Sequence, residues 1–187
     1  LEGIHKIHLI GIGGSGMRAI ANILIQKGYE VSGSDVKESD VIERFRQMGA
    51  TVHIGHNADY VQGVDAVVRS TAIREDNPEI VAAKEQGITI LHRSDIVKAV
   101  LDVTNGIAVA GAHGKTSTTS MIGQILVEGQ MEPTVIIGGE VDYLKGSSCL
   151  GKGEYSVVEA DESDGSFLKL RPKTIVITNI EDDHMDH

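Results

Sequence analysis

The sequence has 187 residues, with 17 Lys and Arg against 27 Asp and Glu, and therefore a net charge of -10 at pH 7. This length accommodates one large domain or two small ones. The acidic balance argues against a protein that grips nucleic acid or an anionic membrane through a basic surface. It does not argue against anionic small ligands, because backbone N–H groups and one or two lysines can hold a phosphate.

The chain is rich in glycine, with 22 residues, and poor in aromatic residues, at 3%. This combination indicates close backbone turns around ligands and not an aromatic stacking surface. The single cysteine, Cys149, excludes an internal disulfide framework and fits a reducing compartment. No apolar run approaches the roughly 20 residues of a membrane span. We therefore expect a cytoplasmic protein.

Short β-branched runs alternate with helical stretches in the first half of the chain. This alternation predicts an α/β fold with a mostly parallel sheet. The expected strands are residues 4–10, 31–33, 51–54, 66–69 and 89–91. The expected helices are a first one whose buried face includes Met17, Ile20, Ala21 and Leu24, then residues 41–48 and 78–86, and a last one from a capping Ser94 to about residue 101.

The second half repeats the order of strand, glycine turn and helix. The expected strands are residues 107–110, 134–137, 155–160 and 174–180, and the expected helix runs from about residue 116 to 128. We expect a boundary near residues 102–106. The predicted fold is thus a Rossmann-like N-terminal domain with a parallel sheet over residues 1–104, followed at 105–187 by part of a P-loop α/β ATPase domain.

The first glycine loop has Gly11, Gly13 and Gly16 in the spacing G-x-G-x-x-G between a predicted strand and a predicted helix. Such a loop gives a tight turn, close backbone approach and a helix N-terminus aimed at a diphosphate. Asp35 ends the second predicted strand, where an acid can bond a ribose hydroxyl or a base. The pattern by itself leaves NAD, FAD and a nucleotide sugar open.

The second glycine loop resembles a Walker A loop but departs from its strict form, since Val109 stands where the pattern requires glycine. Its chemistry is nevertheless present. Gly114 permits close approach of a phosphate, Lys115 supplies a positive charge, and the Thr116 hydroxyl can ligate Mg2+. The loop follows an apolar strand and precedes a helix, as the motif requires.

Acidic residues follow two later strands. Glu159 ends one apolar strand and His184 follows another. Ligands of parallel α/β sheets bind at the carboxyl ends of the strands, which is where both residues are expected. Both are candidate metal ligands. Asp161, Glu162 and Asp164 are individually at least as consistent with a solvated acidic loop. A zinc site is the weaker interpretation, because neither H-E-x-x-H nor a cysteine cluster is present.

Several ordered motifs together make the chain similar to the Mur ligases of bacterial cell-wall synthesis. The resemblance runs nearly end to end and is carried by residues 8–17, 31–35, 70–73, 77–79, 110–119, 159–170 and 178–186. It implies a Rossmann-like domain for the UDP part of a sugar nucleotide, a central ATPase domain and a C-terminal ligase domain. By this comparison the chain stops inside the central domain and lacks the C-terminal one, so we expect it to be catalytically silent alone.

The activity implied by the resemblance is an ADP-forming acid–amino-acid ligation in peptidoglycan biosynthesis. ATP, Mg2+, UDP-N-acetylmuramate and L-alanine are the implied reactants, joined through an acyl phosphate. Residues 13–17 and 162–167 favour the alanine-adding member of the family. A ligase that recycles murein peptide and an NAD-dependent Rossmann enzyme remain alternatives. A monomer and a homodimer both stay open, and the residues that select the amino acid are expected beyond His187.

The resemblance also assigns residues by position. The UDP-sugar would contact Gly11, Ile12, Gly13, Gly14, Ser15, Gly16, Met17, Asp35, Ser70, Thr71, Ala72 and Ile73. ATP would contact Gly111, Ala112, His113, Gly114, Lys115, Thr116, Ser117 and Asn179. Catalysis would use Lys115, Glu159 and His184, and Mg2+ would be held by Thr116, Glu159 and His184. Since the family usually has Thr where Ala112 stands, we expect at most weaker ATP binding from the missing hydroxyl.

Overall fold

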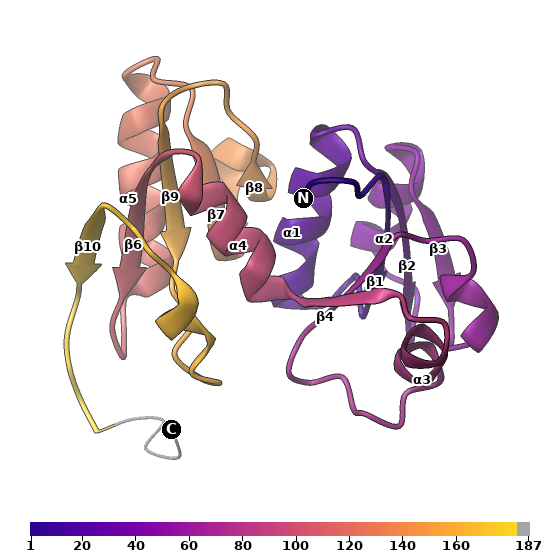
Figure 1. The fold of residues 1–187 in the computed structure, drawn as a ribbon. Helices are drawn as coiled ribbons and strands as arrows, with labels where there is room; N and C mark the ends of the chain where they lie inside the picture. Colours follow the sequence, from indigo (N-terminus) through magenta and orange to yellow (C-terminus); the bar gives the residue numbers. More distant parts are fainter. Residues whose placement is uncertain (183–187) are drawn as a thin grey trace. The chain divides into compact units, whose positions relative to one another are not determined.

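Figure 1 shows the fold in a computed structural model, which describes residues 1–182. The chain divides into two compact units, Leu1–Arg93 and Ser94–His187. This division falls earlier than the motif-based boundary at 104/105, because the helix α4 (Arg93–Asp102) groups with the second unit. Each unit is described by itself.

Unit 1 is built on a five-stranded sheet in the order β3-β2-β1-β4-β5. All four strand pairs are parallel. The strands are β1 (Lys6–Ile10), β2 (Glu30–Asp35), β3 (Thr51–Ile54), β4 (Ala66–Arg69) and β5 (Thr89–His92). The chain first places β2 and β3 on one side of β1 and then crosses to the other side for β4 and β5. The strand order therefore reverses between β1 and β4. In open α/β sheets such a reversal marks the place where ligands bind.

The helices of unit 1 begin and end at recognisable signals. They are α1 (Ser15–Gln26), α2 (Asp40–Gln47), α3 (Pro78–Glu85) and the 3-10 helix η1 (Ala58–Val61). Ser39 caps α2 by accepting from the Ile42 N–H, and Asn77 caps α3, which has Pro78 in its first turn. The core is apolar and fully buried at Ile7, Leu9, Ile20 and Ile80.

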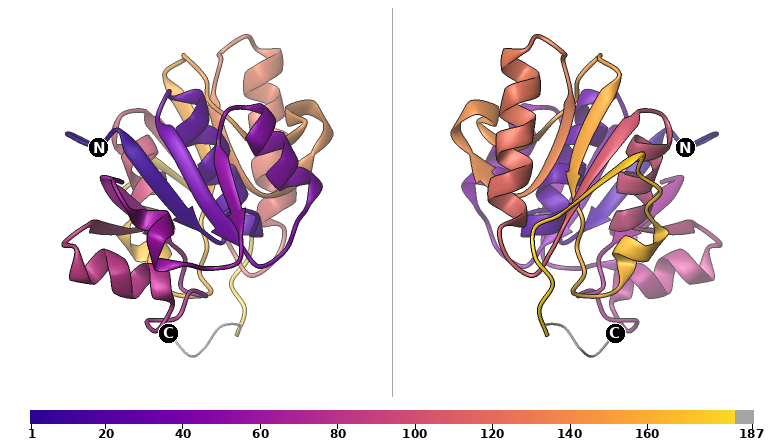
Figure 2. Two further views of the ribbon diagram at one scale, coloured as in Figure 1. Left: turned by 90° about the vertical axis from the view of Figure 1, so that its right-hand side faces the viewer. Right: turned by 90° about the vertical axis from the view of Figure 1, so that its left-hand side faces the viewer.

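Unit 2 contains a mixed sheet in the order β10-β6-β9-β7-β8. Its strands are β6 (Asn105–Ala110), β7 (Thr134–Val141), β8 (Gly146–Cys149), β9 (Tyr155–Glu159) and β10 (Thr174–Ile177). The helix α5 (Lys115–Glu128) packs against β6, β7 and β9, and Figure 2 shows it lying along this sheet. The 3-10 helices η2 (Asp142–Leu144) and η3 (Ser166–Lys169) complete the unit.

The α/β prediction is confirmed, but several details of the sequence-based elements differ. The antiparallel strand β8 was not anticipated, because its sequence Gly-Ser-Ser-Cys lacks an apolar run and pairs only through β7. The strand expected at 174–180 ends at Ile177. Ser94 lies buried inside α4 and does not precede it, since β5 continues directly into the helix. Within residues 1–182, the structure contains no helix with the length and hydrophobicity of a transmembrane span.

Candidate functional site

The first glycine loop joins β1 to α1 at the reversal point of the unit 1 sheet. Gly11 has a φ of +73°, a left-handed conformation that favours glycine. The N–H groups of Gly11 and Ile12 both donate to the Ser34 carbonyl, over 2.8 and 3.0 Å. The loop is therefore fastened to the end of β2. The side chains of Ile12 and Met17 are buried, which leaves only their backbone groups to face a ligand.

Asp35 is directed at the same loop. Its Oδ2 accepts the Gly13 N–H at 2.8 Å, and its Oδ1 accepts the Val36 N–H at 2.7 Å. A Cβ at Gly13 would lie 2.9 Å from Asp35 Oδ2, so glycine permits this approach. The Gly13 carbonyl in turn accepts a hydrogen bond from Arg18 at 2.9 Å. In this structure Asp35 acts on the loop backbone.

The two helices that follow glycine loops differ from α2 and α3 at their N-termini. In the described part of the chain, α1 and α5 begin after Gly14 and Gly114 without a side-chain cap and without an acidic residue in the first turn. The first N–H groups of a helix have no intrahelical partner. Both helix starts therefore offer N–H donors and the positive end of the helix dipole to an anion. In α2 and α3, the side chains of Ser39 and Asn77 accept such an N–H group.

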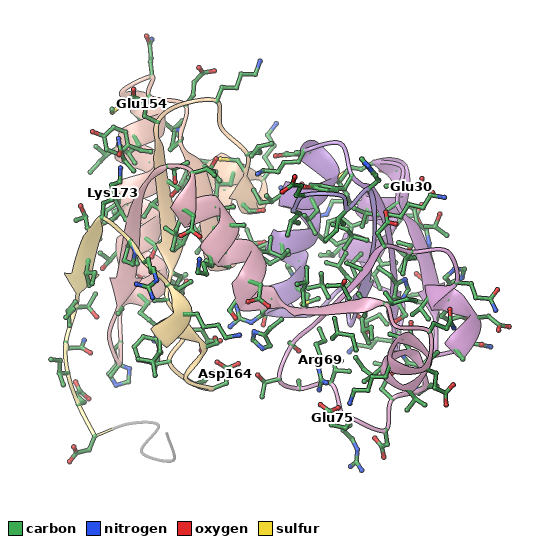
Figure 3. The ribbon with its side chains drawn as sticks, viewed as in Figure 1. Glu30, Arg69, Glu75, Glu154, Asp164 and Lys173 are labelled. Atoms are coloured by element: carbon green, nitrogen blue, oxygen red, sulfur yellow. The ribbon has the colours of Figure 1, made fainter. Side chains whose placement is uncertain are left out.

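The predicted substrate residues 70–73 form a turn after β4. Ile73 donates its N–H to the Ser70 carbonyl at 3.2 Å. Arg69, at the end of β4, donates to the carbonyl of Ile73 and to Glu75 Oε1, the latter at 2.5 Å. Arg69 and Glu75 are labelled in Figure 3. The sequence analysis did not single out Arg69, although it immediately precedes the motif and holds the turn.

A buried polar network lies beneath the unit 1 loop. His8 and Glu79 are fully buried, and His8 Nε2 lies 2.6 Å from Glu79 Oε1. The other His8 nitrogen, Nδ1, lies 2.8 Å from Ser32 Oγ. Ser34 donates its hydroxyl to Glu79 Oε2 at 2.8 Å, and His56 Nδ1 is bonded to the same oxygen.

Burial acts to raise the pKa of Glu79, but hydrogen bonds from His8, His56 and Ser34 outweigh it and hold the pKa below its usual range. The network therefore favours an ionised Glu79. Ser34 also accepts the Gly11 N–H with its carbonyl, so Glu79 is connected to the glycine loop through Ser34. In the sequence, Glu79 stood only within the stretch 77–79 that carries the family resemblance, which gave no indication of this network.

The second glycine loop is shaped by the chain after β10. Gly111 has a φ of +141°, and a Cβ there would lie 2.0 Å from Thr178 Oγ1. Asn179 accepts the His113 N–H at 2.9 Å and donates to the His113 carbonyl at 3.0 Å. Asn179 thus clamps the loop backbone at both groups of one residue. Gly114, with a φ of +84°, precedes α5.

Lys115 is the first residue of α5, and its ammonium group turns back toward the loop. Its Nζ donates to the Gly111 carbonyl at 2.7 Å and to Glu162 Oε1 at 2.7 Å. The Glu162 contact was not anticipated, because the residue lies in an acidic loop that is equally consistent with solvation. Ala112 is half-buried and Ser117 is exposed in the first turn of α5.

Thr116 and Glu159 lie together, as their assignment to one metal requires. Thr116 Oγ1 lies 3.0 and 3.1 Å from the two Glu159 oxygens, and the Gly138 N–H donates to Glu159 Oε2 at 2.7 Å. One hydroxyl and one carboxylate suit Mg2+, which keeps several waters and binds substrate phosphates. In residues 1–182, no group of three or more His, Cys, Asp or Glu residues could hold a metal by itself. His184, the third predicted ligand, lies outside the described residues.

Comparison with known proteins identifies the family of this chain. Residues 6–103 match the Mur ligase family, catalytic domain, and residues 109–187 match the Mur ligase middle domain. The chain belongs to the Mur ligase family.

Among its curated relatives are proteins named UDP-N-acetylmuramate–L-alanine ligase. The one from Desulfatibacillum aliphaticivorans is 49% identical over 183 residues, which cover 98% of this chain and 40% of the relative. The one from Desulforamulus reducens is 52% identical over 184 residues, covering 97% and 40%. The chain thus spans about 40% of the length of these relatives.

Solved structures give the same family. The UDP-N-acetylmuramate-alanine ligase MurC of Thermotoga maritima matches with a TM-score of 0.90 and 36% identity, over 97% of this chain and 43% of that one. The UDP-N-acetylmuramate:L-alanyl-gamma-D-glutamyl-meso-diaminopimelate ligase of Neisseria meningitides matches with a TM-score of 0.89 and 29% identity, over 97% and 62%.

Proposed function

We propose that this protein takes part in the ATP-dependent ligation of L-alanine to UDP-N-acetylmuramate, a step of peptidoglycan synthesis. The observation that carries the proposal is the pairing of Thr116 with Glu159 at the start of α5, next to Lys115. This set of groups suits a Mg2+-bound triphosphate. The names of the curated relatives supply the acceptor and the amino acid.

In this proposal unit 1 binds the UDP part of UDP-N-acetylmuramate. The N–H groups at the start of α1 face the diphosphate, and Asp35 keeps the loop in the required shape. The turn at residues 70–73, held by Arg69, forms a further part of the same pocket. Ser15, Gly14 and Gly16 supply backbone close to the helix start.

Unit 2 binds ATP in this proposal. The loop at residues 111–114 and the start of α5 hold the phosphates, and Lys115 neutralises the terminal ones. Asn179 acts through the loop by fixing His113. Thr116 and Glu159 would hold Mg2+, which supplies neutralisation of the charge on the transferred phosphoryl group. His184 remains a predicted third ligand.

The proposed reaction has two steps. A carboxylate oxygen of the muramyl group attacks the γ-phosphorus of ATP, the bond from that phosphorus to the bridging oxygen breaks, and ADP leaves. The alanine amine then attacks the acyl carbon, the carbon–oxygen bond to phosphate breaks, and amide, phosphate and a proton result. Phosphoryl transfer needs positioning and charge stabilisation, so Lys115 serves without a covalent intermediate on the protein.

A ligase that attaches a peptide in place of alanine is the second candidate. It is favoured by the match to the Neisseria meningitides ligase, whose TM-score of 0.89 is close to that of the Thermotoga maritima enzyme at 0.90. The higher identity to the alanine enzyme, 36% against 29%, ranks it second. An NAD-dependent Rossmann enzyme would leave Lys115, Thr116 and Glu159 unused. We also propose a cytoplasmic location, consistent with the single cysteine and with the need for ATP.

The test has a binding part and an activity part. Calorimetry on the chain with UDP-N-acetylmuramate and with Mg-ATP should give heat for both ligands, and Lys115→Met should remove the second only. Lys173→Met is the matched control, since Lys173 bonds Asn105 at the opposite end of the strands. Phosphate release by the full-length gene product should require UDP-N-acetylmuramate and L-alanine. Release that depends on a peptide would favour the second candidate, and release without the sugar nucleotide would refute both.

A further inference from the structure

The ammonium group of Lys115 is held by a carboxylate and a backbone carbonyl. Its two partners are the Gly111 carbonyl and Glu162 Oε1, both at 2.7 Å. An ammonium has three N–H donors, so these two contacts use most of its hydrogen-bonding capacity. The group that Lys115 is proposed to offer to phosphate is thus already engaged.

The backbone around Glu162 forms a hydrogen-bonded turn. Asp161 Oδ1 accepts hydrogen bonds from the Ser163 N–H and hydroxyl, at 3.0 and 2.6 Å. The Glu162 carbonyl accepts the Gly165 N–H at 3.1 Å, and Gly165 has a φ of +72°. Asp164, labelled in Figure 3, accepts the Ser166 N–H at 2.9 Å. The segment after β9 is therefore an ordered turn.

The ion pair is also shielded from water. The side chains of Lys115 and Glu162 are 15% and 23% exposed. Fully exposed pairs contribute little, whereas shielding strengthens attraction between charges at hydrogen-bond distance. By contrast, the Glu181 carboxylate near His113 is 55% exposed, at 3.3 Å from the imidazole. Glu162 is therefore more shielded from water and closer to its partner than Glu181 is.

We propose that Glu162 is a positioning residue that holds Lys115 against the glycine loop and competes with the β- and γ-phosphates of ATP for its ammonium group. The inference rests on the proposed function and deepens it. When phosphate binds Lys115, it must displace the Glu162 carboxylate. The apparent affinity for ATP is therefore the intrinsic affinity multiplied by the fraction of chains in which Glu162 does not hold the lysine. In return, the lysine is kept facing the loop when no nucleotide is bound.

This competition is specific for the outer phosphates. The lysine of such loops reaches the β- and γ-phosphates. Removing the Glu162 charge should therefore tighten binding of ATP and of inorganic triphosphate, but leave binding of AMP unchanged. A purely structural role for Glu162 would affect all three ligands alike, through a damaged loop.

The experiment compares Glu162→Gln with the unchanged chain by calorimetry, using Mg-ATP, inorganic triphosphate and AMP. Gln keeps the shape and a hydrogen-bond acceptor but removes the charge. The matched control is Glu181→Gln, which removes a charge near the same loop without touching Lys115. We expect Glu162→Gln to tighten ATP and triphosphate binding about tenfold, with AMP and the control variant unchanged.

Each other outcome is decisive. ATP binding that Glu162→Gln leaves equal or weaker would overturn the competition while preserving the proposed function. Equal tightening by Glu181→Gln would also overturn it, because general charge would then be the cause. If neither the unchanged chain nor Glu162→Gln binds ATP or triphosphate, the proposed function and the competition both fail.

Discussion

The backbone N–H of Gly13 donates a 2.8 Å hydrogen bond to Oδ2 of Asp35, a residue expected to contact the UDP-sugar. The second oxygen of Asp35 accepts the Val36 N–H. Both carboxylate oxygens therefore bond to backbone, and one of them fixes the loop between β1 and α1. The effect of Asp35 on a ligand is thus expected to pass through the shape of this loop.

The first prediction concerns Asp35→Asn. Asn has a single oxygen acceptor, so it cannot satisfy both Gly13 and Val36, and one hydrogen bond of about 1 kcal/mol is lost. We expect about fivefold weaker binding of UDP-N-acetylmuramate in calorimetry. Asp65→Asn is the matched control, because Asp65 accepts the N–H groups of His5 and Lys6 at the other end of β1. Equal weakening by both variants would contradict the assignment.

The second prediction concerns Gly13→Ala. The added Cβ would lie 2.9 Å from Asp35 Oδ2 and 3.4 Å from the Ile42 side chain, so the loop or the acid must shift. We expect binding of UDP-N-acetylmuramate to weaken more than tenfold, since a loop that no longer fits loses several contacts at once. Gly146→Ala should have no effect, because a Cβ there meets nothing within 4 Å. Unchanged affinity in Gly13→Ala would show that the loop does not hold the ligand.

The third prediction concerns the pH dependence of stability through Glu79. The pKa of Glu79 is held below its ordinary value of 4.5 in the folded chain, so the ionised form stabilises the fold above that pH and the contribution is lost as the pH falls below it. We expect Glu79→Gln to lower the free energy of unfolding by about 3 kcal/mol at pH 7, because it removes the carboxylate that a buried hydrogen-bond network is built around.

In acid the two proteins should converge as the pH falls below 4.5. Urea unfolding between pH 3 and 7 measures both effects. The control is Glu75→Gln, whose carboxylate is 67% exposed and pairs with Arg69 and Lys84, and which should cost much less at pH 7. A constant difference between Glu79→Gln and the unchanged chain across this range would count against the ionised network.

The fourth prediction concerns Asn179→Ala. The substitution removes both hydrogen bonds to His113, at 2.9 and 3.0 Å, and frees the loop before α5. We expect Mg-ATP binding to weaken about tenfold, at a cost of about 1 kcal/mol for each lost bond. Asn105→Ala serves as the comparison, because Asn105 lies at the opposite end of the sheet and bonds Lys173. An ATP affinity that survives in Asn179→Ala would mean that the loop needs no clamp.

The sequence predicted most of the elements because their signals are local. Pro78 marked the start of α3, and short β-branched runs that alternate with helical stretches marked the parallel sheet of unit 1. The strand β8 was not predicted, because its four small residues show no hydrophobic periodicity. Its position depends on hydrogen bonds to β7. Local patterns report local conformation, whereas pairing at a sheet edge is decided by the partner strand.

Contacts between distant segments were equally invisible. Glu79 meets His8 across 71 residues, and Lys115 meets Glu162 across 47. The interpretation of Glu162 as a solvated acid was reasonable from composition, because an acidic loop gives no indication of which carboxylate turns inward. The same limit applied to His56, whose spacing carried no signal although it joins Glu79 in the buried network.

By itself, the sequence of this acidic, glycine-rich chain determined two glycine loops, each between a strand and a helix, and thereby the positions where backbone approaches an anion. Only the tertiary structure decided which side chains hold those loops: Asp35 beneath Gly13, Asn179 around His113, and Glu162 on Lys115. The physical reason is that a glycine turn is specified by local backbone conformation, while a hydrogen bond or ion pair requires two segments that folding alone brings to within 3 Å.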